Sequence, residues 1–229
     1  MRSGLIGLPA VGKTTLFTLL TNPRAGLTHA ARGPARAEAN IGIAQVADHR
    51  LLRLSAMFRP RKTVPATIEF VDIAGLSKGD AKILLDLAAF RTADALVHVV
   101  RAFTDPAVPH VETTIDPARD ARAMEEELVL ADLGVVEKRL DRLEKDLKKM
   151  RNPESERERD LLVRARPVLE AGDPLRAMAL EPDDLRRLRG FAFLSLKPLL
   201  LVVNLDERDL PRAREMPATL GLDAFAARP

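Results

Sequence analysis

The sequence contains no cysteine, tryptophan or tyrosine, and only 8 phenylalanines among its 229 residues. Without cysteine there is no disulfide, no thiolate nucleophile and no cysteine-based zinc site. So few aromatic side chains argue against a platform that stacks the bases of single-stranded nucleic acid. No apolar run reaches the roughly 18 residues of a membrane span. No basic segment with a long apolar stretch opens the chain, so we expect no secretory signal and a cytoplasmic protein.

Basic residues slightly outnumber acidic ones, with 36 Lys and Arg against 33 Asp and Glu, and the formal net charge is +3. This excess is compatible with contact to RNA or a ribosome. Solvated helix faces are the simpler explanation, because charges of both signs are interspersed. One basic run, Arg59-Pro60-Arg61-Lys62, follows an apolar periodic stretch. It is either a partner-binding patch or, more simply, a helix end stabilised by cations.

A phosphate-binding motif lies near the N-terminus, where Gly7-Leu8-Pro9-Ala10-Val11-Gly12-Lys13-Thr14 fits the pattern G-x-x-x-x-G-K-[ST]. The two glycines let the backbone turn tightly and approach a phosphate without a Cβ. N–H groups at the start of the following helix attract the anion. Lys13 supplies a point charge for the β- and γ-phosphates, and Thr14 offers a hydroxyl to Mg²⁺. Apolar Leu5-Ile6 before the loop and a helical pattern after it give the strand–loop–helix order that this motif needs.

A second motif follows a stretch that we expect to act as a switch. Residues 21–40 are rich in Gly, Ala, Arg and Pro and indicate a loop that folds over the γ-phosphate. The strand that begins at Thr67 then ends in Asp72-Ile73-Ala74-Gly75. In proteins with a phosphate-binding loop, the Asp at this strand end holds Mg²⁺, usually through water, and the Gly N–H can meet the γ-phosphate. The sequence therefore predicts a metal site formed by Thr14 and Asp72.

A third motif lies near the end of the sequence. The apolar run Lys197–Glu207 predicts a buried strand that delivers Asn204 and Glu207 to its carboxyl end, where ligands bind in open α/β sheets. Another buried strand is expected at 95–100, and His98 within it is interpreted as a packed core histidine. His110 lies in a loop, where a structural role is commoner than a catalytic one.

From Pro117 to Leu196 the pattern is helical, because leucines recur at spacings of three, four and seven between charges. Asn152-Pro153 interrupts this run, so we expect an antiparallel coiled-coil hairpin. The predicted fold is a three-layer α/β P-loop NTPase fold with a predominantly parallel sheet. Its nucleotide-binding domain spans 1–116 and 197–229, and the inserted helical arm spans 117–196. Further expectations are a strand at 41–46, helices at 48–58 and 80–92, and a poorly ordered tail over 208–229.

Taken together, the motifs resemble the YchF/Obg-like ATPase family of P-loop NTPases, which is related to the translation-factor GTPases. The stretches that carry the resemblance are Glu38–Gly42, Ile68–Leu76, Val97–Phe103, Leu128–Arg142 and Lys197–Glu207. They extend over nearly the whole chain. The resemblance implies a nucleotide-binding domain with an inserted coiled-coil arm, cytosolic ATP hydrolysis, and association with ribosomes or RNA. We expect Mg²⁺ with ATP or GTP, a monomer, and no membrane partner.

The resemblance also assigns roles to the base-reading and catalytic positions. Proteins of this wider class read guanine with Asn-Lys-x-Asp, and the corresponding stretch here is Asn204-Leu205-Asp206-Glu207. The family's Asn-x-x-Glu variant is associated with accepting ATP as well as GTP, or better. The physical reason is that a site rejects an unmatched ligand strongly only while its specific hydrogen bonds exist. Leu76 stands where Ras-like proteins have a water-positioning glutamine, and the resemblance implies that His110 assists catalysis instead.

The candidate site therefore has three parts. Its catalytic residues are Lys13 and His110, and its metal-binding residues are Thr14 and Asp72. The candidate nucleotide-binding residues are Leu8, Pro9, Ala10, Val11, Gly12, Lys13, Thr14, Thr15, Gly75, Asn204, Leu205 and Glu207.

The sequence departs from the family pattern at several places. Ala10 replaces the usual Asn of the loop, Thr14 replaces its Ser, and the family's switch threonine aligns near Arg36. The segment after Leu76 is shorter, and the C-terminal TGS domain of the family has no counterpart in this sequence. Two functions remain open: a slow ATPase or GTPase that cycles its switch loops on a translation-related partner, and a degenerate, non-catalytic module that interacts through its helical arm.

Overall fold

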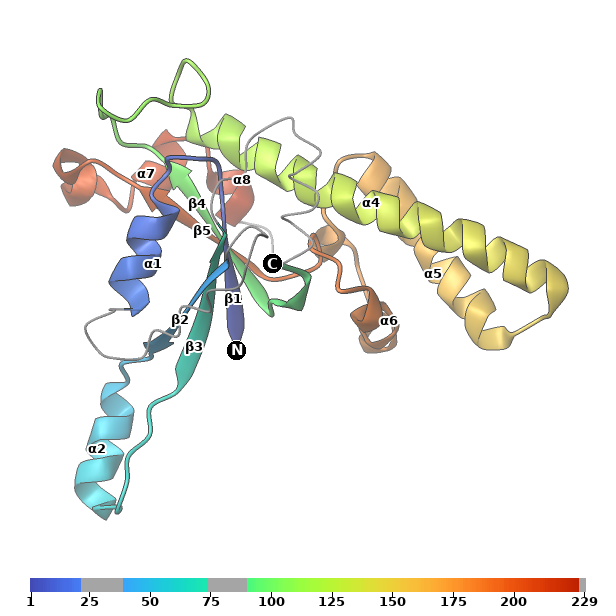
Figure 1. Ribbon diagram of the computed structural model, residues 1–229, viewed down its shortest axis with the longest axis horizontal. Coiled ribbons are helices and arrows are strands. Elements are labelled where there is room, and N and C mark those ends of the chain that lie inside the picture. The colour runs from blue at the N-terminus through green and yellow to red at the C-terminus, as the bar shows by residue number, and fades with distance from the viewer. Residues whose placement is uncertain (22–38, 74–89, 227–229) are drawn as a thin grey trace.

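The computed structural model of the protein describes residues 1–21, 39–73 and 90–226 (Figure 1). A five-stranded sheet forms its centre, with the strand order β2-β3-β1-β4-β5. The strands are β1 (Arg2–Ile6), β2 (Ala39–Gln45), β3 (Thr67–Ile73), β4 (Ala95–Arg101) and β5 (Leu199–Asn204). Only the pairing of β2 with β3 is antiparallel, so the predominantly parallel sheet predicted from the sequence is confirmed.

The central strands are buried because a parallel sheet of this class is covered on both faces. Every residue of β4 is buried, including the polar His98, whose residual exposure is 2%. The interpretation of His98 as a core histidine is therefore confirmed. Gly4 of β1 pairs with Val71 on one side and Leu96 on the other. This register places the carboxyl ends of β1, β3 and β4 at one edge of the sheet.

The described residues form helices of very different length. They are α1 (Lys13–Thr21), α2 (His49–Phe58), α4 (Pro117–Lys149), α5 (Pro153–Glu170), α6 (Pro182–Leu188), α7 (Met216–Thr219) and α8 (Asp223–Ala226). Short 3-10 turns occupy Phe90–Thr92, Leu175–Ala177, Arg189–Phe191 and Glu207–Arg212. Within the described ranges, no helix combines the length and the apolar composition that a bilayer crossing requires.

The predicted helical hairpin is present, and it extends away from the sheet (Figure 1). Both of its helices begin as the sequence indicates, since the side chains of Asp116 and Asn152 cap N–H groups and a proline follows each cap. The first half of α4 packs on the sheet through Met124 and Leu128. Its second half pairs with α5 around a separate core that includes Leu140.

Asp132 joins α4 to the segment that leads into β5. Its fully buried carboxylate accepts hydrogen bonds from the backbone N–H groups of Leu194 (3.0 Å) and Ser195 (2.7 Å) and from Arg91 (3.2 Å). Burial raises the pKa of Asp132, and the donated hydrogen bonds oppose this shift. The base of the arm is therefore attached to the sheet by buried polar contacts as well as by apolar packing.

The tail does not follow the prediction. A poorly ordered segment after Arg208 was expected from its lack of a clear apolar pattern, and this expectation is wrong for the described residues up to 226. The chain forms α7 and α8 there, and Leu222 is 1% exposed in a cluster with Val100, Ala118 and Ala121. Leu220 and Phe225 pack against the same cluster, so apolar side chains of the tail are buried at a site formed by distant parts of the chain.

Two further expectations concern segments that lie mostly outside the described residues. Of the helix expected at 80–92, the described portion Phe90–Thr92 is a 3-10 turn. Of the switch loop expected at 21–40, residues 22–38, with Arg36, lie outside the described residues, whereas Thr21 ends α1 and Ala39 begins β2. Residues 74–89, with Gly75 and Leu76, lie outside the described residues as well.

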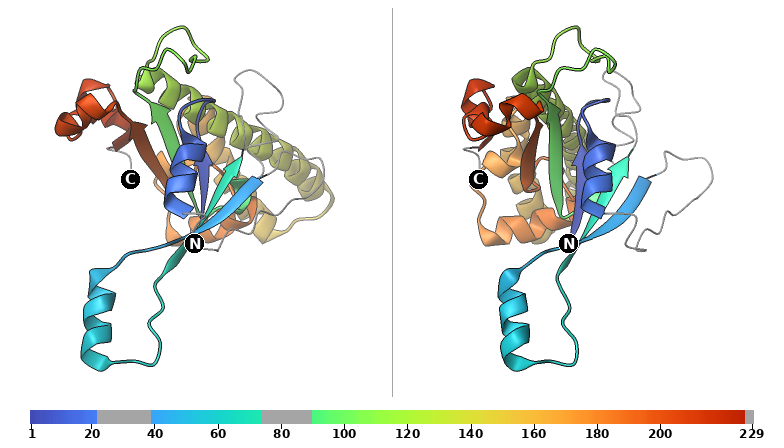
Figure 2. Two further views of the ribbon diagram at one scale, coloured as in Figure 1. Left: turned by 60° about the vertical axis from the view of Figure 1, so that its left-hand side comes forward. Right: turned by 90° about the vertical axis from the view of Figure 1, so that its left-hand side faces the viewer.

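Helix α2 and the segments that join it to β2 and β3 project from the sheet, and they point in a different direction from the α4–α5 hairpin (Figure 2). Asp48 caps α2 at its start, so the predicted helix is confirmed. None of its residues is buried, although its apolar residues recur at helical spacing.

Candidate nucleotide-binding site

The loop between β1 and α1 has the backbone conformation that the phosphate-binding motif requires. Gly7 and Gly12 have φ angles of 142° and 99°, which side chains rarely permit. A Cβ on Gly12 would lie 2.5 Å from Nδ2 of Asn204. That Asn204 atom donates a 3.0 Å hydrogen bond to the carbonyl of Val11. The end of β5 is thus fastened directly to the loop, which explains the need for glycine at position 12.

Ala10 occupies a conformation that is unfavourable for its side chain. Its φ is 60°, in the left-handed region. Asn and Gly adopt this region more readily than Ala. Ala10 therefore stores backbone strain at the loop tip.

Lys13 is the most perturbed cation of the site. The residue is 6% exposed, and its Nζ donates to the carbonyls of Gly7 (2.9 Å) and Leu8 (2.7 Å). Burial lowers the pKa of Lys13 to about 8, and the nearby charge of Asp72 opposes this shift. A phosphate that binds here competes with two loop carbonyls for the ammonium group and brings the negative charge that favours its protonation.

Thr14 and Asp72 come together as the sequence predicts. The Thr14 hydroxyl donates a 2.9 Å hydrogen bond to Oδ2 of Asp72, whose residue is 0% exposed. The other carboxylate oxygen, Oδ1, is buried without a hydrogen-bond partner. A buried carboxylate oxygen without a donor beside a hydroxyl fits the needs of Mg²⁺, which prefers oxygen ligands and retains several waters. Among the described residues no cluster of three metal-binding side chains exists, so phosphate oxygens would have to complete such a site.

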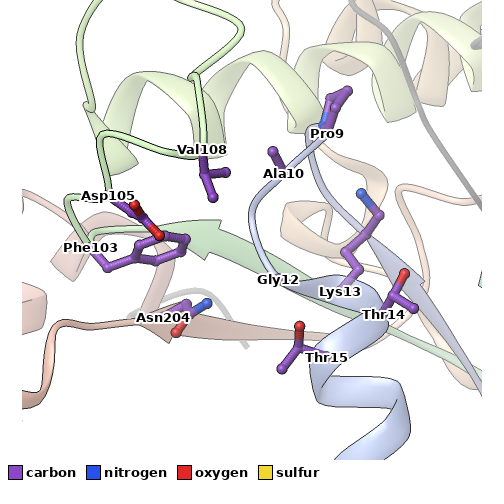
Figure 3. Close-up of a pocket in the computed structure, with 10 residues that line it drawn as sticks. All are labelled: Pro9, Ala10, Gly12, Lys13, Thr14, Thr15, Phe103, Asp105, Val108 and Asn204. Carbon is purple, nitrogen blue, oxygen red and sulfur yellow. The ribbon is translucent and has the colours of Figure 1, made fainter.

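Lys13 and Thr14 lie in the wall of a cavity of about 620 Å³ at the carboxyl edge of the sheet (Figure 3). Its lining consists of Pro9, Ala10, Gly12, Lys13, Thr14, Thr15, Phe103, Asp105, Val108 and Asn204. Seven of these are predicted nucleotide-binding residues. Leu8 and Val11 are buried behind the loop. Leu205 and Glu207 are not part of the lining, and Gly75 lies outside the described residues.

One wall of the cavity was missed by the sequence analysis. Phe103, Asp105 and Val108 follow the carboxyl end of β4, a position that is a general signal for ligand contact in α/β sheets. Arg101 holds this wall in place from beneath. Its buried guanidinium lies 4.3 Å from the centre of the Phe103 ring and donates to the carbonyls of Phe103 (3.1 Å) and Asp105 (3.4 Å).

The stretch expected to read the base is bound to the same wall. Asp206 does not face the cavity, because its Oδ2 accepts a 3.1 Å hydrogen bond from the backbone N–H of Thr104. Glu207 is exposed at the start of a 3-10 turn. Of this stretch, only Asn204 lines the cavity in the described structure.

His110 lies apart from the cavity lining. Its side chain is 5% exposed, with Nε2 3.0 Å from Oδ2 of Asp120 on α4. Nδ1 of the same ring lies 3.0 Å from the backbone N–H of Glu112, which donates to it. The histidine is therefore held between its own loop and the first turn of α4, and it does not converge with Lys13.

The carboxyl ends of the parallel strands β1 and β3 bring a glycine-flanked loop, a lysine and a threonine–aspartate pair to one edge of the sheet, and this arrangement defines a P-loop NTPase fold. A family model described as 50S ribosome-binding GTPase matches residues 2–163. The chain belongs to this family and, within it, to the YchF group.

Individual relatives agree with this assignment. The chain is 40% identical over 210 residues to the ribosome-binding ATPase YchF of Haemophilus ducreyi, covering 90% of this chain and 57% of the relative. Its identity to the protein of the same name from Bacillus subtilis is 36% over 214 residues, covering 92% and 58%. The solved structure of the Schizosaccharomyces pombe YchF GTPase superimposes with a TM-score of 0.76 at 30% identity, covering 97% and 61%. The chain thus spans less than two thirds of the length of these relatives.

Proposed function

We propose that the protein binds a purine nucleotide, ATP or GTP, together with Mg²⁺ and hydrolyses it slowly as a nucleotide switch linked to the ribosome. The observation that carries this proposal is that Lys13, Thr14 and Asn204 line one cavity, with Asp72 hydrogen-bonded to Thr14 beside it. The names of the relatives support nucleotide hydrolysis and a ribosome link, since they are called ribosome-binding ATPases and a GTPase.

In this proposal the residues act mainly by positioning. Backbone N–H groups of the loop and the start of α1 bind the phosphates, and Lys13 neutralises the charge that develops between the β- and γ-phosphates. Thr14 and Asp72 hold Mg²⁺, which supplies further positive charge to the phosphates when bound. Val108 and Phe103 shield one side of the nucleotide from water.

His110 remains a catalytic candidate with one requirement. Its ring must leave Asp120 and turn toward the γ-phosphate before it can orient water. His110→Ala should then lower kcat and leave nucleotide affinity unchanged. Asp120→Asn weakens the attachment of the ring, so it should not lower kcat if His110 is catalytic. A loss of thermal stability with unchanged kcat in His110→Ala would assign the histidine to structure.

The base site is proposed to accept ATP at least as well as GTP. Asn204 lines the cavity, and Leu205 and Glu207 are proposed to reach the base from the adjoining turn. Among the described residues that line the cavity, Asp105 carries the carboxylate. Without the Lys and Asp of the guanine-reading motif, discrimination against adenine should be weak.

The domain division supports a switch that communicates with a partner. We propose that 1–116 and 197–229 bind the nucleotide and that 117–196 forms the arm, in a monomeric cytoplasmic protein. The first half of α4 belongs to both, because it packs on the sheet while its second half forms the arm. Movement at the nucleotide could therefore reach the arm through α4.

The second candidate is a non-catalytic interaction module that works through the arm. The attachment of His110 to Asp120, away from the cavity, favours it. Both candidates allow a ribosome or RNA partner, so a measurement of nucleotide hydrolysis separates them.

The deciding experiment measures binding of fluorescent ATP and GTP analogues with and without Mg²⁺, followed by turnover. We expect Mg²⁺-dependent binding with ATP at least as tight as GTP. Lys13→Ala should abolish turnover, whereas Lys145→Ala, which changes an exposed lysine of the arm, should not. Equal turnover in the wild type and Lys13→Ala would indicate contamination and exclude the enzyme. Binding of neither nucleotide would leave the interaction module.

A further inference from the structure

The hairpin that carries α2 is strongly basic and stands clear of the described body of the protein. Five basic residues, Arg50, Arg53, Arg59, Arg61 and Lys62, lie between Asp48 and Glu69, and no acidic residue lies among them. In both views of Figure 2 the helix and the returning segment extend away from the sheet. This contrasts with the helical arm, residues 117–196, where charges of both signs are interspersed.

Four of these cations have no counter-charge in the described structure. Arg50 pairs with Asp48 at 2.9 Å. The side chains of Arg53, Arg59, Arg61 and Lys62 are exposed, and they form no ion pair or hydrogen bond with another described residue. A cluster of like charges without internal partners attracts an anionic partner.

The residue that ends α2, Arg59, is a cation in a strained backbone conformation. Arg59 has a φ of 43°, in the left-handed region, and its N–H donates to the carbonyl of Ser55. Helices usually end in this conformation with glycine, which carries no Cβ penalty. An arginine at this position costs stability without making a described side-chain contact. Strain retained at an exposed cation points to a binding role.

Large apolar side chains are exposed beside the cations. Met57 and Phe58 are 72% and 75% exposed, and Leu52 is 67% exposed. Positions 50, 53 and 57 share one helix face, so Met57 lies within the basic surface. The half-buried Ser55 faces the returning segment, where its hydroxyl lies 2.6 Å from that of Thr63.

We propose that residues 49–64 form an RNA-docking surface, in which arginine and lysine contact phosphates and Met57 and Phe58 contact ribose or an unpaired base. Arginine dominates the surface, and its planar guanidinium suits phosphate recognition. An anionic membrane fits less well, because Met57 lies among the cations of α2 and interrupts the polar face that an interfacial helix presents to lipid headgroups. The charge of the surface indicates an anionic partner, and the choice of RNA as that anion rests on the ribosome link of the proposed function.

This surface is separate from the nucleotide site. It precedes β3, whose carboxyl end carries Asp72, so the two sites lie at opposite ends of that strand. A substitution in the hairpin should therefore leave nucleotide binding intact. That separation makes the two functions independently measurable.

The test measures binding of a fluorescein-labelled RNA stem–loop by the whole protein over a series of salt concentrations. The triple variant Arg53→Gln, Arg61→Gln, Lys62→Gln removes three exposed charges. Each lost phosphate contact lowers the slope of log K against log salt by about 0.7–0.9, so we expect a decrease of about 2. If binding at 1 M salt is unaffected, this amounts to about 100-fold weaker binding at 0.1 M salt.

A matched control changes three exposed lysines on α4, Lys145→Gln, Lys148→Gln and Lys149→Gln, and leaves the hairpin intact. We expect its RNA affinity to fall less than threefold, as net charge alone acts weakly at a distance. Equal losses in both variants, no loss in either, or no RNA binding by the wild type would overturn the proposal. Binding to phosphatidylglycerol vesicles that the hairpin variant loses, with RNA binding unchanged, would overturn it in favour of a membrane.

A second variant separates binding from folding. Arg59→Gly relieves the left-handed strain, so its thermal unfolding midpoint should stay the same or rise while its RNA affinity falls several-fold. Full RNA affinity in Arg59→Gly would overturn the role of the turn. Fluorescent ATP binding, measured on the same samples, should be unchanged; its absence in the wild type would refute the proposed nucleotide function and leave the RNA surface standing.

Discussion

Thr14 and Asp72, 58 positions apart in the sequence, meet through a 2.9 Å hydrogen bond from the threonine hydroxyl to Oδ2 of the aspartate. The remaining carboxylate oxygen is buried without a hydrogen-bond partner. A buried acceptor without a donor is costly, and a cation relieves that cost. This pair is therefore where dependence on Mg²⁺ should originate.

Asp72→Asn should remove most of the Mg²⁺ dependence of nucleotide binding. The substitution preserves an oxygen for Thr14 but eliminates the negative charge, and we expect the gain in affinity from Mg²⁺ to fall by about 10- to 100-fold. Titration with a fluorescent nucleotide, with Mg²⁺ and with EDTA, measures this. Asp141→Asn, at an exposed position on α4, serves as the control. An unchanged response to Mg²⁺ in Asp72→Asn would remove the aspartate from the metal site.

Nucleotide binding should take up a proton at alkaline pH. Burial lowers the pKa of Lys13 to about 8, and a bound phosphate raises it again because it stabilises the ammonium form. At about pH 9 most free protein has neutral Lys13, so binding should take up close to one proton; at about pH 7 it should take up almost none. Calorimetry in two buffers of different ionisation enthalpy measures the uptake. Lys13→Arg, which stays charged, should show none, and equal uptake at both pH values would contradict the assignment.

Ala10→Asn should stabilise the free protein. Ala10 has a φ of 60°, and Asn tolerates this conformation better, so we expect a gain of about 0.5–1 kcal/mol in the free energy of unfolding. Urea denaturation gives the value. The control is Ala66→Asn, an exposed alanine outside the left-handed region. A gain of equal size in the control would show that strain at Ala10 is not its source.

Acid should destabilise the protein through His98. Burial, helped by the charges of Lys13 and Arg176, lowers the pKa of His98 from 6.5 to about 3. The unfolded chain therefore binds the proton first, and stability should fall as pH drops below about 6.5, by at most about 1.4 kcal/mol per pH unit, until about pH 3. Denaturation of the wild type and His98→Gln at several pH values tests this. The variant should be less stable at neutral pH and lose less on acidification; parallel pH curves would contradict the prediction.

Much of the architecture follows from local patterns. The loop motif Gly7–Thr14, the strand at 95–101 and the helical hairpin each depend on residues that are close in sequence, so periodicity and glycine placement predict them. The cavity wall at Phe103, Asp105 and Val108 was not predicted, because only the parallel pairing of β4 with β1 brings it to the loop. The placement of His110 against Asp120 likewise depends on how α4 begins.

The sequence by itself determined the phosphate-binding loop, the cation that serves it and the helical arm, since each is encoded by a short motif or a repeating pattern. Tertiary structure alone decided three other features: the cavity wall at Phe103, Asp105 and Val108, the packing of Leu222 on α4, and the exposure of α2. The reason is that a parallel sheet joins strand ends that are far apart in the chain, whereas an amphipathic pattern does not specify which surface will cover it.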